Sequence, residues 1–154
     1  MSIWFGINVF ILVFVLWKVL AGTLSIHILF GASAFFVLLY NFTRHAFFAT
    51  IRSNIKRSIK IKFAHISKRV LPYHKWTGSL AFFLMVIHAS IIIHKFGFHQ
   101  SSFKMMTGIF AALIFFAVVL FGWLRWYRTT VFRRYAHWIL AFFLLFAALI
   151  HIAI

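Results

Sequence analysis

Residues 73–98 read YHKWTGSLAFFLMVIHASIIIHKFGF, and this stretch decides the fold. It contains an apolar run of about the 20-residue length that a helix needs to cross a bilayer, and the run carries His74 and His88. Four other stretches are long and apolar enough to cross as well: residues 3–20, 24–42, 106–124 and 135–154. The sequence therefore predicts an all-α fold, with residues 1–154 in a single polytopic membrane bundle of about five transmembrane helices.

The composition agrees with a membrane protein and excludes many kinds of site. Of the 154 residues, 65% are hydrophobic and 10% are charged, whereas a typical soluble domain has about 25% charged residues. The chain has 16 Lys and Arg residues, no Asp or Glu and no Cys. Paired-acid hydrolysis, a Ser-His-Asp triad, carboxylate-bound Mg²⁺ or Ca²⁺ and iron–sulfur clusters are therefore excluded. The nine histidines remain as candidate metal ligands.

The basic residues predict how the chain sits in the membrane. Nine lie between the second and third spans (Arg44, Arg52, Lys56, Arg57, Lys60, Lys62, Lys68, Arg69 and Lys75), and four lie between the fourth and fifth (Arg125, Arg128, Arg133 and Arg134). Lys- and Arg-rich loops remain cytoplasmic, so we expect a cell-membrane protein with the N-terminus inside and the C-terminus outside. The positive charge could also suit nucleic acid, but the apolar composition favours the lipid bilayer as partner and no nucleic acid.

The loop between the second and third spans has a helical pattern of its own. Apolar residues recur in it at steps of three and four: Ile51, Ile55, Ile59, Phe63, Ile66 and Val70. This periodicity predicts a basic amphipathic helix on the cytoplasmic side. Such a helix suits the inner headgroup layer, and it also suits docking of an acidic soluble partner. Pro72 marks the expected start of the next helix.

Two pairs of histidines have the same spacing. His74 and His88 lie 14 residues apart in the third span, and His137 and His151 lie 14 apart in the fifth. A step of 14 residues in an α-helix returns to within about 40° of the starting direction and rises about 21 Å. Because the third and fifth spans run parallel, His74 and His137 share one depth near the cytoplasmic side. His88 and His151 share another depth, near the outer side.

Two opposed imidazoles in an apolar bundle indicate haem iron, because zinc takes three or four protein ligands. Gly78, one turn after His74, leaves room for a flat macrocycle. The sequence thus predicts two b-type haems, the inner one bound by His74 and His137 and the outer one by His88 and His151. Their propionates need cationic partners. The candidates are Lys75, Arg44, Arg125 and Arg134 inside and Lys95 and Lys104 outside, each of which can instead be a snorkelling lipid anchor.

The other five histidines are weaker candidates. His27 and His45 share one face of the second span, and we expect them to be polar anchors or to contact the ligands from behind. They are ligands only if the pairing above is wrong. His94 either lines the outer mouth or is a second choice of ligand for the outer haem. His65 and His99 are expected to be solvated.

The string His74-Lys75-Trp76-Thr77-Gly78, followed by Ala81-Phe82 and His88-Ala89, resembles the haem-binding helix of the ferric reductase-like transmembrane domain superfamily. This superfamily includes ferric reductases, NADPH oxidases and the haem-carrying membrane subunit of bacterial methionine sulfoxide reductase systems. The matching features are the first His, the basic residue after it, the Gly one turn later and the second His. His137 and His151 match the second His pair of the family, and the resemblance covers residues 24–154.

The resemblance implies electron transfer through two haems to an acceptor outside, such as ferric iron or dioxygen. Many family members have a sixth span, and several have a flavin and nicotinamide domain. This chain ends three residues after His151 and contains no Gly-rich dinucleotide motif. We therefore expect no flavin site in this chain, and a separate flavoprotein reductase or a membrane quinol as the electron donor. The second span lacks the central basic residue of some oxidases, which disfavours dioxygen as acceptor.

Two other classes of function fit parts of the pattern. The chain can be a non-catalytic membrane anchor or assembly subunit that holds an acidic partner protein through its basic inner face. A small transporter or channel is less favoured, because no predicted span is broken or carries a polar stripe.

Overall fold

The computed structural model describes residues 3–99 and 101–154, and this part of the chain is helical without strands. The α-helices are α1 (Ile3–Ala21), α2 (Ile26–Arg52), α3 (Arg57–Val70), α4 (His74–Phe96), α5 (Phe103–Tyr127) and α6 (Val131–Ala153), with a short 3₁₀ helix, η1, over Leu71–Tyr73. Five segments of the described chain, which contain α1, α2, α4, α5 and α6, are long and apolar enough to cross a membrane. The predicted all-α bundle is therefore confirmed.

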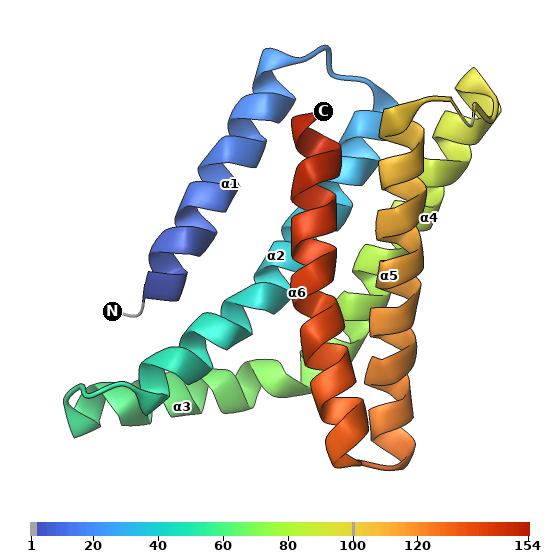
Figure 1. The fold of residues 1–154 in the computed structure, drawn as a ribbon. Helices are drawn as coiled ribbons and strands as arrows, with labels where there is room; N and C mark the ends of the chain where they lie inside the picture. The colour runs from blue at the N-terminus through green and yellow to red at the C-terminus, as the bar shows by residue number, and fades with distance from the viewer. Residues whose placement is uncertain (1–2, 100) are drawn as a thin grey trace.

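The five long helices run up and down, and α3 lies across one end of them (Figure 1). The most extensive contacts join α2 to α4 and α5 to α6, while α1 contacts α2 and, more lightly, α6. The basic residues of α3 and of the α5–α6 connection lie at the lower end in Figure 1, which we call the basic end. The α1–α2 turn, the α4–α5 connection and the C-terminus lie at the opposite end.

Helix α2 extends further than its hydropathy predicts. The expected span ended at residue 42, but the helix continues to Arg52, so Arg44 and His45 lie within it rather than in a loop. The additional residues of α2 are packed within the bundle, because Ala46 and Thr50 are both buried. Hydropathy alone placed the boundary too early, since a charged residue on one side of a helix does not end it when the other side is packed.

The amphipathic helix predicted from the loop is present as α3, but it begins only at Arg57, because Ile51 belongs to α2 and Ile55 lies in the connection between the two helices. Its Phe63 packs against Phe5 of α1 and Phe47 of α2, with ring centroids 5.9 and 5.3 Å apart. Ile59 and Ile66 remain exposed. Pro72 lies in η1, so the chain turns there before α4 begins at His74.

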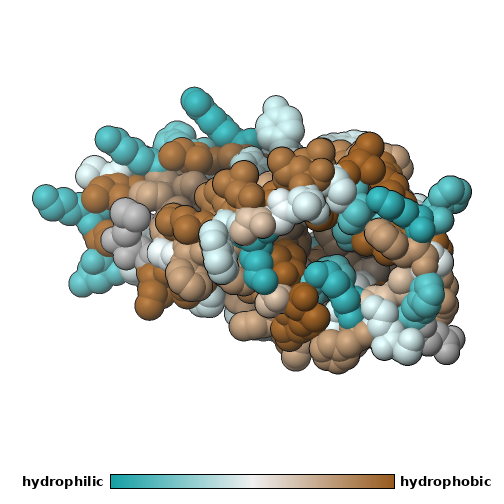
Figure 2. Space-filling model, turned by 90° about the horizontal axis from the view of Figure 1, so that it is seen from above, coloured by the Kyte–Doolittle hydropathy of each residue, from teal (hydrophilic) through white to brown (hydrophobic). Residues whose placement is uncertain are grey.

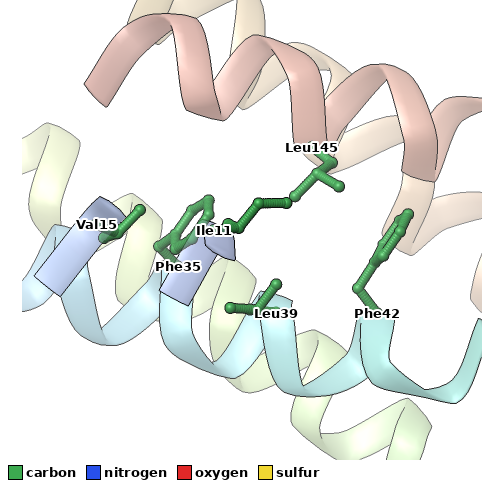
Figure 3. Close-up of a cluster of buried hydrophobic side chains, with 6 residues drawn as sticks. All are labelled: Ile11, Val15, Phe35, Leu39, Phe42 and Leu145. Carbon is green, nitrogen blue, oxygen red and sulfur yellow. The ribbon is translucent and has the colours of Figure 1, made fainter. Parts of the chain in front are cut away.

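Two buried clusters hold the bundle together, and α6 contributes to both. One joins α1, α2 and α6 and is shown in Figure 3: Ile11, Val15, Phe35, Leu39, Phe42 and Leu145. The other joins α2, α4, α5 and α6: Leu38, Ala81, Phe115, Val118 and Leu144. Many other large apolar side chains are exposed, for example Leu113 at 64%, as expected for helices that face lipid. The packing thus places α4 and α6 near each other, backed by α2 and α5.

Candidate functional site

The structure brings four histidines of α4 and α6 together in two pairs. The ring centroids of His74 and His137 lie 6.2 Å apart, and those of His88 and His151 lie 6.3 Å apart. All four side chains are partly buried. We call the first pair, which lies nearer the basic end, the inner level, and the second pair the outer level. No third His, Cys, Asp or Glu forms a metal-binding group of three with either pair within the described residues.

Each of the four imidazoles has its Nδ1 atom hydrogen-bonded to oxygen. Three donate to main-chain carbonyls: His88 to His27 (2.6 Å), His137 to Val118 (2.9 Å) and His151 to Lys104 (3.1 Å). A carbonyl only accepts, so Nδ1 carries the hydrogen in these rings. Nε2 is then the atom with the free lone pair, and it is the atom available to a metal ion.

The fourth imidazole has a different partner. His74 Nδ1 donates to the side-chain oxygen Oδ1 of Asn41 at 2.9 Å. The hydroxyl of Thr77 donates to the same oxygen at 2.7 Å, and Asn41 Nδ2 donates to the Val37 carbonyl at 3.0 Å. Sequence analysis missed Asn41. The available signal was an amide side chain near the end of an apolar span, where polar groups are rare and usually functional.

Glycines allow three of the imidazoles to approach these carbonyls. A Cβ atom at Gly31 would lie 2.8 Å from His88 Nδ1, and one at Gly108 would lie 2.9 Å from His151 Cε1. One at Gly122 would lie 3.3 Å from His137 Cε1. Each glycine follows its carbonyl-bearing residue by four positions, so each lies one helical turn further along. Sequence analysis missed these glycines, although Gly108 and Gly122 repeat the 14-residue spacing of the histidines.

A cavity of about 400 Å³ lies at the outer level. All five long helices line it, and many of the lining residues are small, among them Gly31, Ala32, Ala89, Gly108, Ala112 and Ala148. His88, His151, Lys18 and Lys104 also line it. Figure 2 looks onto the end of the molecule away from the basic end and shows hydrophilic residues around a hollow among apolar ones. At the inner level, an added Cβ at Gly78 would meet nothing within 4 Å, so this glycine faces open space.

Two arginines near the inner level lack partners for buried atoms. The Nε atoms of Arg44 on α2 and Arg125 on α5 are buried without a hydrogen-bond partner in the described part of the chain. Both guanidinium groups interact electrostatically with His74 and His137, and they repel each other. Because the chain has no Asp or Glu, no side-chain carboxylate of its own can neutralise them. The two arginines are therefore suited to hold a bound anion.

The other predicted cations are placed differently. Lys75 Nζ lies among three indole rings, 5.0, 4.6 and 3.9 Å from the centroids of Trp76, Trp123 and Trp126. Arg134 is exposed and lies over the ring of Tyr135. These contacts are cation–π interactions at the edge of the bundle, so neither cation is directed at the inner histidines in this structure.

The cations at the outer end also differ from expectation. Lys95 lies over the ring of Phe96, whereas Lys104 lines the cavity. Lys18 of α1, which sequence analysis did not single out, lines the same cavity and donates to the Ala153 carbonyl at 3.0 Å. Only the packing of α1 beside α6 brings Lys18 there, and no local sequence pattern predicts that packing.

The remaining histidines stay outside the two pairs. His27 contacts Ser25 Oγ at 3.1 Å and supplies the carbonyl behind His88, in agreement with a contact from behind a ligand. The ring of His45 packs among aromatic rings, with centroids 4.5, 5.5 and 5.2 Å from Trp4, Trp138 and Phe142. His65, His94 and His99 are exposed.

Comparisons of this chain with protein-family models, curated proteins and solved structures found no match. We therefore infer function from the geometry and chemistry of the two histidine pairs.

Proposed function

We propose that the chain binds two b-type haems and passes electrons through them across the membrane, as the haem-carrying component of an oxidoreductase similar to the ferric reductases. The inner haem would be held by His74 and His137 and the outer haem by His88 and His151. The observation that carries this proposal is the matched geometry of the two pairs, in which each Nδ1 atom is occupied by an oxygen partner.

The distances between the paired rings suit one metal ion with an imidazole on each side. A bond from a first-row metal ion to an imidazole nitrogen is about 2 Å long. Ring bonds of about 1.33 Å place each ring atom about 1.15 Å from the ring centroid. Two opposed imidazoles on one ion therefore have centroids about 6.3 Å apart, and the measured separations are 6.2 and 6.3 Å.

The hydrogen bonds behind the rings suit ligation equally well. A metal-ligating histidine almost always donates its other ring N–H to a carbonyl, a carboxylate or water, which fixes the tautomer and the ring orientation. Here three main-chain carbonyls and the Asn41 side chain supply those acceptors. A histidine that only anchors a helix at the lipid surface has no need of such a partner.

The surroundings suit two large, flat, dianionic ligands. At the outer level the cavity gives space, and Lys18 and Lys104 line it. At the inner level Gly78 faces open space, and Arg44 and Arg125 have unpartnered buried Nε atoms. We assign the inner propionates to these two arginines and the outer propionates to the two lysines. The residues present therefore fit the proposed group.

Bound haem would supply one-electron chemistry between ferric and ferrous iron. With two histidines holding each haem iron, the chain would offer no open coordination site to a substrate. The cationic groups near each level favour the reduced state, because they stabilise the added electron.

The positive-inside bias supports a direction of transfer. With the basic end in the cytoplasm, electrons would arrive at the inner level from a separate flavoprotein reductase or from a membrane quinol. They would leave at the outer level, about 21 Å higher along α4 by helix geometry. The N-terminus would then be cytoplasmic and the C-terminus outside.

The decisive experiment measures haem directly. The protein is purified from haem-replete cells, and a reduced-minus-oxidised spectrum is recorded with the haem-to-protein ratio. We expect a b-type spectrum and two haems per chain, both low-spin in the ferric state. A colourless preparation would overturn the proposal.

An anchor for an acidic partner is the second candidate function. It is favoured by the exposed basic side chains of α3, namely Arg57, Lys62, Lys68 and Arg69. Electrostatic complementarity of this kind gives specificity and fast association. Copurification of a soluble acidic protein with a haem-free chain would support it over electron transfer. Both functions hold if that partner is the electron donor.

A further inference from the structure

We infer that Asn41 is a positioning residue that sets the redox potential of the inner haem and leaves the outer haem unaffected. This inference rests on the proposed function. Asn41 is the one side-chain amide among the acceptors behind the four imidazoles in the described residues.

The exception has a structural cause. The acceptors behind His88, His151 and His137 are the carbonyls of residues 27, 104 and 118, each followed by a glycine four positions later. Asn41 lies 14 residues after His27 on α2, so it holds the equivalent place at the inner level. Four positions later the chain has His45 in place of a glycine. At this place the acceptor for His74 is the Asn41 side chain instead of the main chain.

The orientation of the Asn41 amide is fixed by its other hydrogen bonds. Its Nδ2 donates to the Val37 carbonyl, and its Oδ1 accepts from Thr77 as well as from His74. A flipped amide would place its NH2 group against the His74 N–H and its oxygen against the Val37 carbonyl oxygen, so neither of those hydrogen bonds would form. Asn41 Oδ1 therefore accepts from both His74 and Thr77, and the Thr77 bond reduces the electron density that this oxygen offers to His74.

A hydrogen-bond acceptor at Nδ1 changes the redox potential of the haem iron, because the effect passes through the imidazole ring to Nε2. A stronger acceptor draws the Nδ1 hydrogen away and makes Nε2 a better electron donor. A better donor stabilises ferric iron over ferrous iron and lowers the potential. Substitutions at positions 41 and 77 should therefore tune the inner haem. At the outer level the acceptors are main-chain carbonyls, which side-chain substitution does not remove, although the Thr107 hydroxyl also donates to the Lys104 carbonyl and lies 3.3 Å from His151 Nδ1.

The first test replaces the amide by a carboxylate. The midpoint potentials of both haems are measured by spectroscopic titration in the full-length protein and in Asn41→Asp. The inner haem is identified in the same titration of His88→Ala. We expect Asn41→Asp to raise the preference of the inner site for ferric over ferrous haem about tenfold, which lowers its potential by about 59 mV. The outer potential should not move.

Asn8→Asp is the matched control. Asn8 is also a buried amide in a membrane span, on α1, and it makes no hydrogen bond to any of the four imidazoles within the described chain. It adds the same charge without changing an acceptor, so both potentials should stay as in the unaltered protein. An equal fall in the inner potential of Asn8→Asp would show that charge alone acts, and would overturn the role of the hydrogen bond.

Thr77→Val tests the same inference without adding charge. Losing the second O–H donor leaves Asn41 Oδ1 to His74 alone. The preference of the inner site for ferric over ferrous haem should therefore rise roughly threefold, which lowers the inner potential by about 30 mV. Unchanged potentials in both the Asn41 and Thr77 variants, with two haems bound, would overturn this inference but not the proposed function. A colourless unaltered protein would instead overturn the proposed function.

Discussion

The inner and outer levels hold their imidazoles at nearly the same separation by different means. At the outer level, both Nδ1 atoms are bonded to main-chain carbonyls, beside Gly31 and Gly108, and a cavity lies next to the rings. At the inner level, His137 is bonded in the same way beside Gly122, but His74 is bonded to a side-chain amide, and two partly buried arginines lie near the pair. The difference teaches that three of the imidazoles depend on the close approach of a main-chain carbonyl, whereas the fourth, His74, depends on side-chain chemistry.

The largest effect is expected from removing one ligand. His88→Ala should remove the outer haem, because a single imidazole then remains at that level. The haem-to-protein ratio should fall from about two to about one, and electron transfer across proteoliposomes should stop. The inner haem should keep its spectrum, because its ligands and their acceptors lie one level away. Two haems in the purified variant would show that the pairing is wrong.

The second prediction tests backbone approach at the outer level. In Gly31→Ala the new Cβ would lie 2.8 Å from His88 Nδ1, so the imidazole must shift away from the His27 carbonyl. Loss of such a supporting contact weakens metal binding about 10–100-fold. The readout is the rate at which apomyoglobin removes haem from the purified protein. Gly6→Ala is the control, since a Cβ there meets nothing within 4 Å; equal haem loss in both variants would argue against a specific contact.

The sequence predicts the helices and the two histidine levels because both follow from helix geometry. A 14-residue step places two side chains on one face at two heights, and the apolar spans set which helices run parallel. Helix geometry therefore predicts that His74 and His137 lie at one depth, whereas the meeting of their two helix faces depends on tertiary packing. The approximate ends of the spans follow from hydropathy, except where packing of Ala46 and Thr50 extends α2 past Arg44.

The surroundings of the histidines could not be predicted in the same way. Asn41, Gly31 and Lys18 belong to helices that contact the histidine-bearing helices only through tertiary packing. Which face of α2 meets α4 depends on the fit of many side chains, and no local pattern encodes it. The local signals were the spacing of Gly108 and Gly122, which repeats the histidine spacing on α5, and the amide of Asn41 near the end of an apolar span.

The third prediction tests side-chain chemistry at the inner level. Arg44→Gln removes a guanidinium group that we assign to a propionate. A hydrogen bond to a charged group contributes about 1.5–3 kcal/mol, and because Arg125 remains we expect the lower end of that range, so inner haem should bind about tenfold more weakly. Its potential should also fall, because a positive charge that stabilised the reduced state is gone. Haem-transfer rates and a redox titration provide the measurements.

Arg134→Gln is the control for Arg44→Gln. It removes the same charge from an exposed position over Tyr135, so haem binding and both potentials should remain unchanged. If both variants weaken the inner haem equally, the effect comes from the overall positive charge of the basic end, and the assignment of Arg44 to a propionate is wrong.

The smallest effect is expected at Lys18, through which α1 contributes an ammonium group to the outer cavity. Lys18→Met keeps an unbranched side chain but removes the ammonium group that lines the cavity and bonds to the Ala153 carbonyl. Lys104 still lines the cavity, so the outer haem should bind only a few-fold more weakly, about 1 kcal/mol, with a slightly lower potential. Lys95→Met, which removes an exposed ammonium over Phe96, should change neither. A larger effect from Lys95 than from Lys18 would mean that the outer anion is held at the rim of the bundle and not in the cavity, and the assignment of the outer propionates to Lys18 would then be wrong.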